Sequence, residues 1–286
     1  MLDMVKQSAV AFIDDEALTR GAAIAFYTVT SIGPVLFIVV AIAGLAFGED
    51  AARGAISGEL GGLMGRQSAD LLEAAIRNAG RTSSGFLAAT IGIVTLIITA
   101  SGVFTEMQQT LNVIWRAEPK GTTVSRLIRA RAASLGLVAT LGFLLLVSLV
   151  VSALLTALSD TINAYIPFGH LIFKALTFLV SFGLITLLFG AIYRILPDRR
   201  VEWHDVMVGA VVTAFLFTAG KFLISLYIGS SAMASSYGAA GSLIIVLLWI
   251  YYSAQIFLLG AEFTKVFAAH RGSHQHRKRD LLAERT

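Results

Sequence analysis

Two glutamates and two lysines stand within or beside long apolar stretches of this sequence, where a charged side chain is costly. Glu106 and Glu262 could bind and release protons, which is how a proton gradient is coupled to movement of a substrate. Lys174 and Lys221 could attract a phosphate or carboxylate group. By helical rise Lys221 lies about 12 Å inside its predicted helix, so we expect a functional role or a buried ion pair. Lys174 lies nearer a helix end, where extension of its side chain to the interface is the simpler explanation.

Polar residues recur at intervals of three or four within each apolar stretch, a spacing that places side chains on one face of a helix. In the C-terminal stretch this face carries Tyr252, Gln255 and Glu262. Several such helices could surround a shared polar cavity, because a charge facing water costs less than one facing lipid. The alternative is structural, since serine and threonine hydrogen-bond to carbonyls of their own helix and, with glycine and alanine, allow close packing.

The candidates for a substrate pathway or its gate are Tyr27, Ser31, Pro34, Thr99, Glu106, Asn112, Arg194, Lys221, Gln255 and Glu262. Glu106 and Glu262 fall near the same predicted membrane boundary as Arg194, which predicts an acidic gate closed by Arg194. The same depths argue against a direct salt bridge between Lys221 and Glu262. Pro34 is a candidate hinge with Gly102, because proline removes a backbone donor from its helix.

Metal-dependent and nucleophilic chemistry finds no support in the sequence. There is no cysteine, and the five histidines form no pattern typical of metal ligands. Phosphate-binding loops, dinucleotide-binding glycine motifs and nucleophile elbows are also missing from the sequence. We therefore expect no metal, no cofactor and no enzyme activity, and an intramembrane enzyme is the least favoured class of function.

Long apolar helices are needed to hold these residues, and the composition predicts them. Of the 286 residues 56% are hydrophobic and only 14% are charged, well below the charged share of a soluble domain. Runs of about 20 apolar residues, enough to cross a bilayer, predict six transmembrane helices at 21–47, 86–105, 133–159, 171–196, 206–229 and 242–268. The amphipathic segment 49–83 is expected at the extracytoplasmic surface. The predicted fold class is an all-α integral membrane protein with one polytopic domain, 1–268, and a basic tail, 269–286.

Lysine and arginine are concentrated in the connections on one side of these helices, together with both ends of the chain. Because cytoplasmic connections carry the excess of basic residues, we expect both termini in the cytoplasm. The same distribution explains the net charge of +4 without a nucleic-acid partner. The N-terminal segment lacks the apolar core of a cleaved signal peptide, so targeting is expected to come from the first helix. The tail is expected to be a solvated anchor in preference to a site for anionic headgroups.

Four motifs carry a resemblance to a known family. They are GAAIAFYTVTSIGP at 21–34, FTEMQQTLNVIW at 104–115, YRILPDRRVEWHDVMVGA at 193–210 and YGAAGSLIIVLLWIYYSAQIFLLGAEF at 237–263. With them the chain resembles the YihY/BrkB family of multi-pass inner-membrane proteins, once labelled ribonuclease BN. The resemblance covers nearly the whole chain and departs from the family pattern at Gly33, where many members have a bulkier residue before the proline.

The resemblance implies six membrane helices, a bacterial inner-membrane location and a transporter-like role linked to serum resistance or to export of envelope lipid. We therefore expect a transporter or exporter of an anionic or amphipathic envelope component, with membrane lipids and an anionic lipid or small anion as partners. The alternative is a non-transporting scaffold in envelope assembly, and a homo-oligomer stays open. Ribonuclease activity is not expected, because the histidines form no metal-binding cluster.

Overall fold

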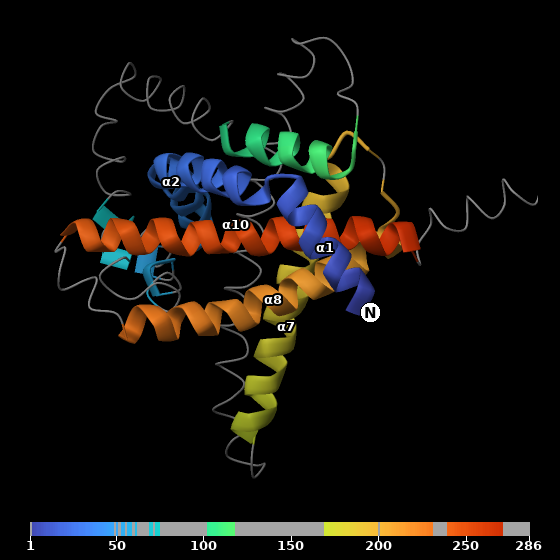
Figure 1. Ribbon diagram of the computed structural model, residues 1–286. Helices are drawn as coiled ribbons and strands as arrows, with labels where there is room; N and C mark the ends of the chain where they lie inside the picture. Colours follow the sequence, from blue (N-terminus) through green and yellow to red (C-terminus); the bar gives the residue numbers. More distant parts are fainter. Residues whose placement is uncertain are drawn as a thin grey trace, which may run out of the picture.

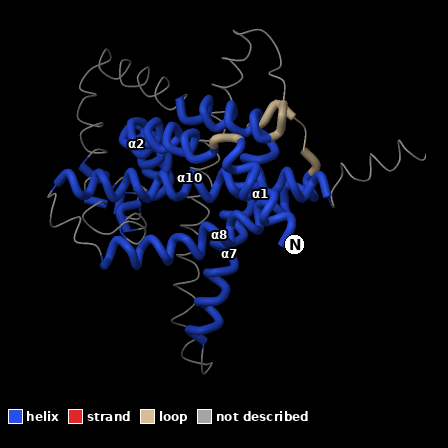
Figure 2. Tube along the Cα trace, viewed as in Figure 1, coloured by secondary structure: helices blue, strands red, loops and turns tan. Residues whose placement is uncertain are grey.

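The computed structural model describes residues 2–48, 102–117, 169–199, 201–230 and 239–270, together with separate residues between 50 and 74. Within these ranges the regular structure is entirely helical (Figures 1 and 2). The described residues between 50 and 74, which belong to the predicted amphipathic segment, are also helical. The all-α class predicted from the sequence is therefore confirmed for the described part of the chain.

Four of the described helices are much longer than the average helix of a soluble protein. They are α2 (Ala17–Phe47), α7 (Gly169–Ile195), α8 (Trp203–Ser230) and α10 (Ala239–His270). A short amphipathic helix, α1 (Leu2–Asp14), precedes them, and a further helix occupies residues 102–114. The long helices contain 27 to 32 residues, which exceeds the roughly 20 residues needed to cross a bilayer.

Four of the six predicted membrane helices coincide with these long helices. Three described stretches are long and apolar enough to cross a membrane: Ala175–Ile195, Trp203–Ile224 and Leu243–His270. Helix α2 covers the first predicted span and begins earlier, at Ala17. The predicted span 133–159, most of 86–105 and the tail beyond residue 270 lie outside the described residues. Six spans and cytoplasmic termini therefore stay predictions.

Helix α10 lies at the centre of the described helices (Figure 1). It packs against α8, α2 and α1, and α7 packs against α8. The core between α7, α8 and α10 is aromatic, because Phe189, Tyr193 and Phe257 stack with ring centroids 5.2 to 6.3 Å apart. The Tyr193 hydroxyl is fully buried and donates a hydrogen bond to the Phe257 carbonyl at 2.6 Å.

Helices α8 and α10 cross at a pair of small residues. A Cβ atom at Gly209 of α8 would collide with Thr264 of α10, and one at Gly260 of α10 would collide with Thr213 of α8. Each threonine hydroxyl donates to the carbonyl four residues earlier in its own helix, at 2.7 Å. Because Gly209 lies opposite Thr264 and Thr213 lies opposite Gly260, the two helices are antiparallel. The glycines allow the two backbones to approach closely, as small residues do at helix contacts in membranes.

Candidate functional site

The chain turns sharply at Asp15 and Glu16, which join α1 to α2 and are called the elbow below. Glu16 adopts the left-handed conformation with φ of 55°, unusual for a residue with a side chain. Arg20 of α2 reaches back and donates from Nε to the Asp15 carbonyl at 3.0 Å. The elbow thereby turns the Asp15 side chain inward, where it is only 2% exposed.

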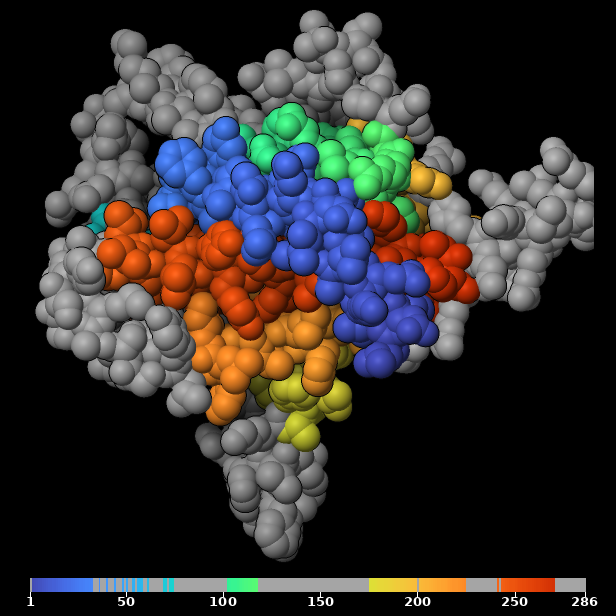
Figure 3. Space-filling model, in the orientation of Figure 1, coloured from blue at the N-terminus to red at the C-terminus, as the bar shows by residue number. Residues whose placement is uncertain are grey.

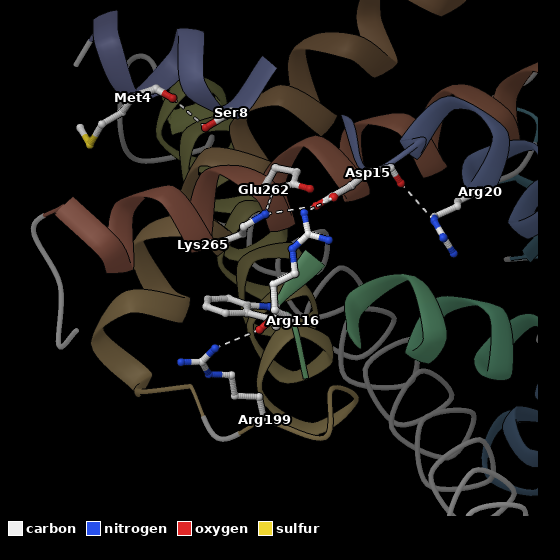
Figure 4. A network of polar contacts seen from close by, with 9 residues as sticks. Met4, Ser8, Asp15, Arg20, Arg116, Arg199, Glu262 and Lys265 are labelled. Atoms are coloured by element: carbon white, nitrogen blue, oxygen red, sulfur yellow. Dashed lines mark hydrogen bonds and ion pairs between the residues drawn. The ribbon is translucent and has the colours of Figure 1, made fainter. Parts of the chain in front are cut away.

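The Asp15 carboxylate joins three parts of the chain that are far apart in the sequence (Figure 4). Arg116 Nη2 lies 2.6 Å from Oδ1, and Lys265 Nζ of α10 lies 3.1 Å from Oδ2. Lys265 also donates to Oε2 of Glu262 at 3.0 Å, one turn earlier in α10. We call these residues, Asp15, Arg116, Glu262 and Lys265, the ion cluster.

Glu262 is the most deeply buried member of the ion cluster. Its side chain has 0% exposure, and Oε1 has no hydrogen-bond partner among the described residues. A buried carboxylate must be compensated by opposite charge and hydrogen bonds, and here Lys265 supplies the ion pair. The arrangement places two carboxyl groups around one ammonium group, so Lys265 links Glu262 to the elbow.

The surroundings of Asp15 favour its ionised form. Burial by itself would raise the pKa of Asp15, but hydrogen bonding with the Glu262 carboxyl, the hydrogen bond and charge of Lys265, and the charge of Arg116 together lower the pKa below its ordinary value. Asp15 is therefore an anion at neutral pH, and its bonds to Lys265 and Arg116 are charge-assisted.

Arg116 reaches Asp15 because of how the helix at 102–114 ends. Arg116 has φ of 48°, its N–H donates to the Val113 carbonyl, and the Ala117 N–H donates to the Asn112 carbonyl. This is the Schellman arrangement, in which a left-handed residue closes a helix; glycine usually occupies that place. The Arg116 side chain is 66% exposed, so its ion pair is partly screened by solvent.

Asn112, one of the predicted site residues, fastens the same helix end to the segment after α7. Its side-chain amide donates from Nδ2 to Asp198 Oδ2 and accepts from the Asp198 N–H, both at 2.8 Å. Arg199 donates to the Trp115 carbonyl at 3.0 Å. Both the nitrogen and the oxygen of the Asn112 side-chain amide therefore bind Asp198, which is a structural role.

The predicted polar face of α10 is covered by the elbow and the start of α2. Gln255 donates from Nε2 to the Leu18 carbonyl at 3.3 Å, and its side chain occupies the space where a Cβ of Gly21 would lie. Glu262 joins the ion cluster on the same face. Like Glu262, Gln255 keeps a buried oxygen, Oε1, without a partner among the described residues. The structure thus brings these two predicted residues together along one helix contact.

One predicted residue of α2, Tyr27, packs against the helix at 102–114, and Ser31 and Glu106 have contacts within their own helices. The Tyr27 ring packs at Gly102, where an added Cβ would be 3.1 Å from the ring. Ser31 is buried and donates to the Thr28 carbonyl of its own helix. Glu106 is partly buried, and its backbone carbonyl accepts a hydrogen bond from Thr110. These contacts fit helix packing as well as a polar lining.

The remaining predicted residues are not members of the ion cluster, or they lie outside the described residues. The Arg194 guanidinium lies over the Trp203 ring, 5.6 Å from its centroid, and the basic partner of Glu262 is Lys265. Lys221 is partly buried in α8. Thr99 and the side chains of Pro34 and Lys174 lie outside the described residues.

Sequence reasoning missed three of the four members of the ion cluster. Asp15 and Arg116 lie in a polar turn and a helix end, so nothing in the local pattern separates them from solvated charges. Lys265 follows Glu262 by three residues, the spacing of neighbours on one helix face, and this signal could have identified it. Among the described residues no group of histidine and acidic side chains is arranged to hold a metal ion.

A known protein family matches nearly the whole chain. A family model described as virulence factor BrkB matches residues 9–283. The chain belongs to the virulence factor BrkB family. The match covers all four residues of the ion cluster and confirms the resemblance seen in the sequence motifs. Membrane character follows from the family together with the long apolar helices.

Curated relatives of this BrkB-family chain are named UPF0761 membrane proteins. One from Pasteurella multocida (strain Pm70) is 34% identical over 62% of this chain and 54% of its own length. One from Alteromonas mediterranea (strain DSM 17117 / CIP 110805 / LMG 28347 / Deep ecotype) is 34% identical over 66% of this chain and 63% of its own length. The chain thus spans less than two thirds of these relatives. Their names assign no enzyme activity, and no solved structure matches.

Proposed function

We propose that this BrkB-family chain is a transporter of the bacterial inner membrane that exports an anionic or amphipathic envelope component. The ion cluster is the observation that carries the proposal. Buried charge within a membrane protein is costly and marks functional segments. Here it joins the elbow, the end of the helix at 102–114 and α10 at one point. In this proposal the cluster is the closed cytoplasmic gate.

Opening of the gate would uncover the polar face of α10. Gln255 and Glu262 face the elbow and the start of α2, and each keeps one oxygen without a hydrogen-bond partner among the described residues. Movement of the elbow would break the contacts of Asp15 with Lys265 and Arg116. It would also uncover the Oε1 atoms of Gln255 and Glu262, which would then accept hydrogen bonds from a substrate. Glu262 and Glu106 would couple transport to protons, and Lys221 and Lys174 would attract an anion from the outer side.

The proposed topology has six membrane helices with both termini in the cytoplasm. It is supported by the distribution of lysine and arginine and by the three apolar helical stretches long enough to cross a bilayer. In this orientation α8 runs outward and α10 returns, in keeping with their antiparallel packing at Gly209 and Gly260. The ion cluster then lies toward the cytoplasmic end of α10.

A non-transporting scaffold is the second candidate, and a specific observation favours it. Gln255 packs on Gly21, Asn112 binds Asp198, and Arg194 lies over Trp203, so these predicted pathway residues take part in contacts between segments. Such contacts are expected of a rigid bundle that recruits partners for envelope assembly. The two candidates differ in whether the protein alone moves a substrate.

Transport by purified protein in liposomes separates them. Liposomes would contain a fluorescent phosphatidylglycerol, and its loss from one leaflet would be followed with and without protein under an imposed proton gradient. We expect faster movement with the wild-type protein, and slower movement with Glu262→Gln because the proposed proton-binding group is removed. The matched comparison is a fluorescent phosphatidylcholine, which carries no net charge. Movement of both lipids at the protein-free rate would exclude lipid export by this chain. The non-transporting scaffold would then be the remaining candidate.

A further inference from the structure

Helix α1 exposes an apolar stripe formed by Leu2, Val5, Ala9 and Ile13. The exposed fractions of the three large side chains are high: 85% for Leu2, 55% for Val5 and 68% for Ile13. Their spacing along the helix places all four residues on one side. Exposed large apolar side chains gathered on one face of a helix mark a contact with another apolar phase.

The opposite side of α1 packs against α10. Met4 is buried and packs with Phe263 and Val266 of α10. Ser8 is also buried and donates to the Met4 carbonyl at 2.8 Å. Asp15, directly beyond the end of α1, joins the ion cluster. The direction of the stripe is therefore fixed relative to α10, and Figure 3 shows α1 on the outside of the molecule.

We propose that α1 lies in the plane of the membrane interface, with the stripe inserted among lipid headgroups and the first acyl carbons. The family and the apolar helices place a bilayer beside this chain. Helix α1 has 13 residues, about 20 Å at the rise of an α-helix, which is too short to cross the bilayer. Beyond the elbow, α2 also exposes large apolar side chains, with Leu18 53% and Phe26 61% exposed.

The charges of α1 identify the kind of lipid contact. Asp3 and Asp14 outnumber Lys6, and all three are exposed. Attraction to anionic headgroups needs an excess of basic residues, which this helix lacks. Binding would therefore depend on insertion of the stripe and be insensitive to the anionic lipid content, while Lys6 beside the stripe could extend to the headgroups.

Site-directed spin labelling tests the proposal directly, because the chain has no cysteine of its own. Single variants Ala9→Cys, on the stripe, and Gln7→Cys, on the exposed polar side, would be labelled in the full-length protein. Both would be reconstituted in vesicles of phosphatidylcholine alone and of phosphatidylcholine with phosphatidylglycerol. Accessibility to oxygen, which concentrates in lipid, is compared with accessibility to a water-soluble nickel chelate.

We expect the ratio of oxygen to nickel accessibility to be several-fold higher at residue 9 than at residue 7, and equal in the two kinds of vesicle. Equal ratios at the two sites would overturn the proposal, because the stripe would then face water. Low access to both reagents at residue 9 would also overturn it, since a protein surface would cover the stripe. A ratio that rises only with phosphatidylglycerol would show electrostatic binding instead. Met4→Ala, which weakens the packing of α1 on α10, should leave the ratio at residue 9 high but increase label mobility.

Discussion

At the scale of single residues, the ion cluster combines members of very different burial. Glu262 is fully buried and Asp15 nearly so, whereas the Lys265 side chain is 25% exposed and Arg116 is 66% exposed. An exposed partner contributes little, since water competes for its charge. Removal of a buried partner leaves an uncompensated charge and costs much more. The two basic residues should therefore differ strongly in their effect on stability.

We expect Lys265→Met to lower the free energy of unfolding by about 3 kcal/mol, as for other broken buried ion pairs. Arg116→Met should lower it by no more than about 1 kcal/mol. Chemical unfolding in detergent micelles, followed by tryptophan fluorescence, measures both values. The control is the double variant Lys265→Met with Glu262→Gln, which removes the buried charge and should recover part of the loss. Equal losses for the two single variants would contradict this account.

The lowered pKa of Asp15 predicts an acid limit to stability. The folded pKa lies below the ordinary value of 3.8, so the stabilisation by ionised Asp15 is complete above that pH and is lost as the pH falls through the folded pKa. The difference in unfolding free energy between wild type and Asp15→Asn should still be present at about pH 5 and should shrink below about pH 4. A difference that disappears already near pH 6 would show that Asp15 is not held as an anion.

At the scale of helices, apolar runs of sufficient length were enough to predict α7, α8 and α10 nearly to their ends. Length and hydropathy are local properties, so a single sequence reveals them. Contacts between helices are different: Lys265 lies 250 residues from Asp15, and Arg116 lies 101 residues from it. No spacing rule reaches that far, which is why Glu262 could be identified from the sequence while Asp15 and Arg116 could not.

The crossing of α8 and α10 makes a prediction at this scale. Gly260→Ala should destabilise the protein by about 1 to 3 kcal/mol, the usual cost of overpacking, because the new methyl group would meet Thr213 and the Tyr193 hydroxyl. Gly183→Ala in α7 is the matched control, since a Cβ there meets none of the described residues within 4 Å. It should be neutral or stabilising by up to about 1 kcal/mol, because alanine favours helix. Thermal unfolding in detergent compares the two variants, and equal effects would refute the close crossing.

At the scale of the whole molecule, the elbow connects the short helix α1 to the long helices that pack around α10. Helix α1 contacts α10 through Met4, Phe263 and Val266, while Asp15 connects the elbow to Lys265 and Arg116. Apolar packing and ion pairing thus both hold α1 and the elbow against α10. If the elbow must move for transport, α1 has to shift relative to α10, and a covalent link between them should prevent it.

We therefore expect a short cross-link between Met4→Cys and Val266→Cys to stop transport of the fluorescent phosphatidylglycerol in liposomes. These two positions pack in one cluster, and the absence of native cysteine keeps the reaction confined to them. A reducible thiol-specific cross-linker allows the block to be reversed, which separates it from damage to the fold. Each single cysteine variant treated with the same reagent is the control and should keep its activity. If the cross-linked protein transports at the full rate, α1 does not move during the cycle, and the gate must open elsewhere.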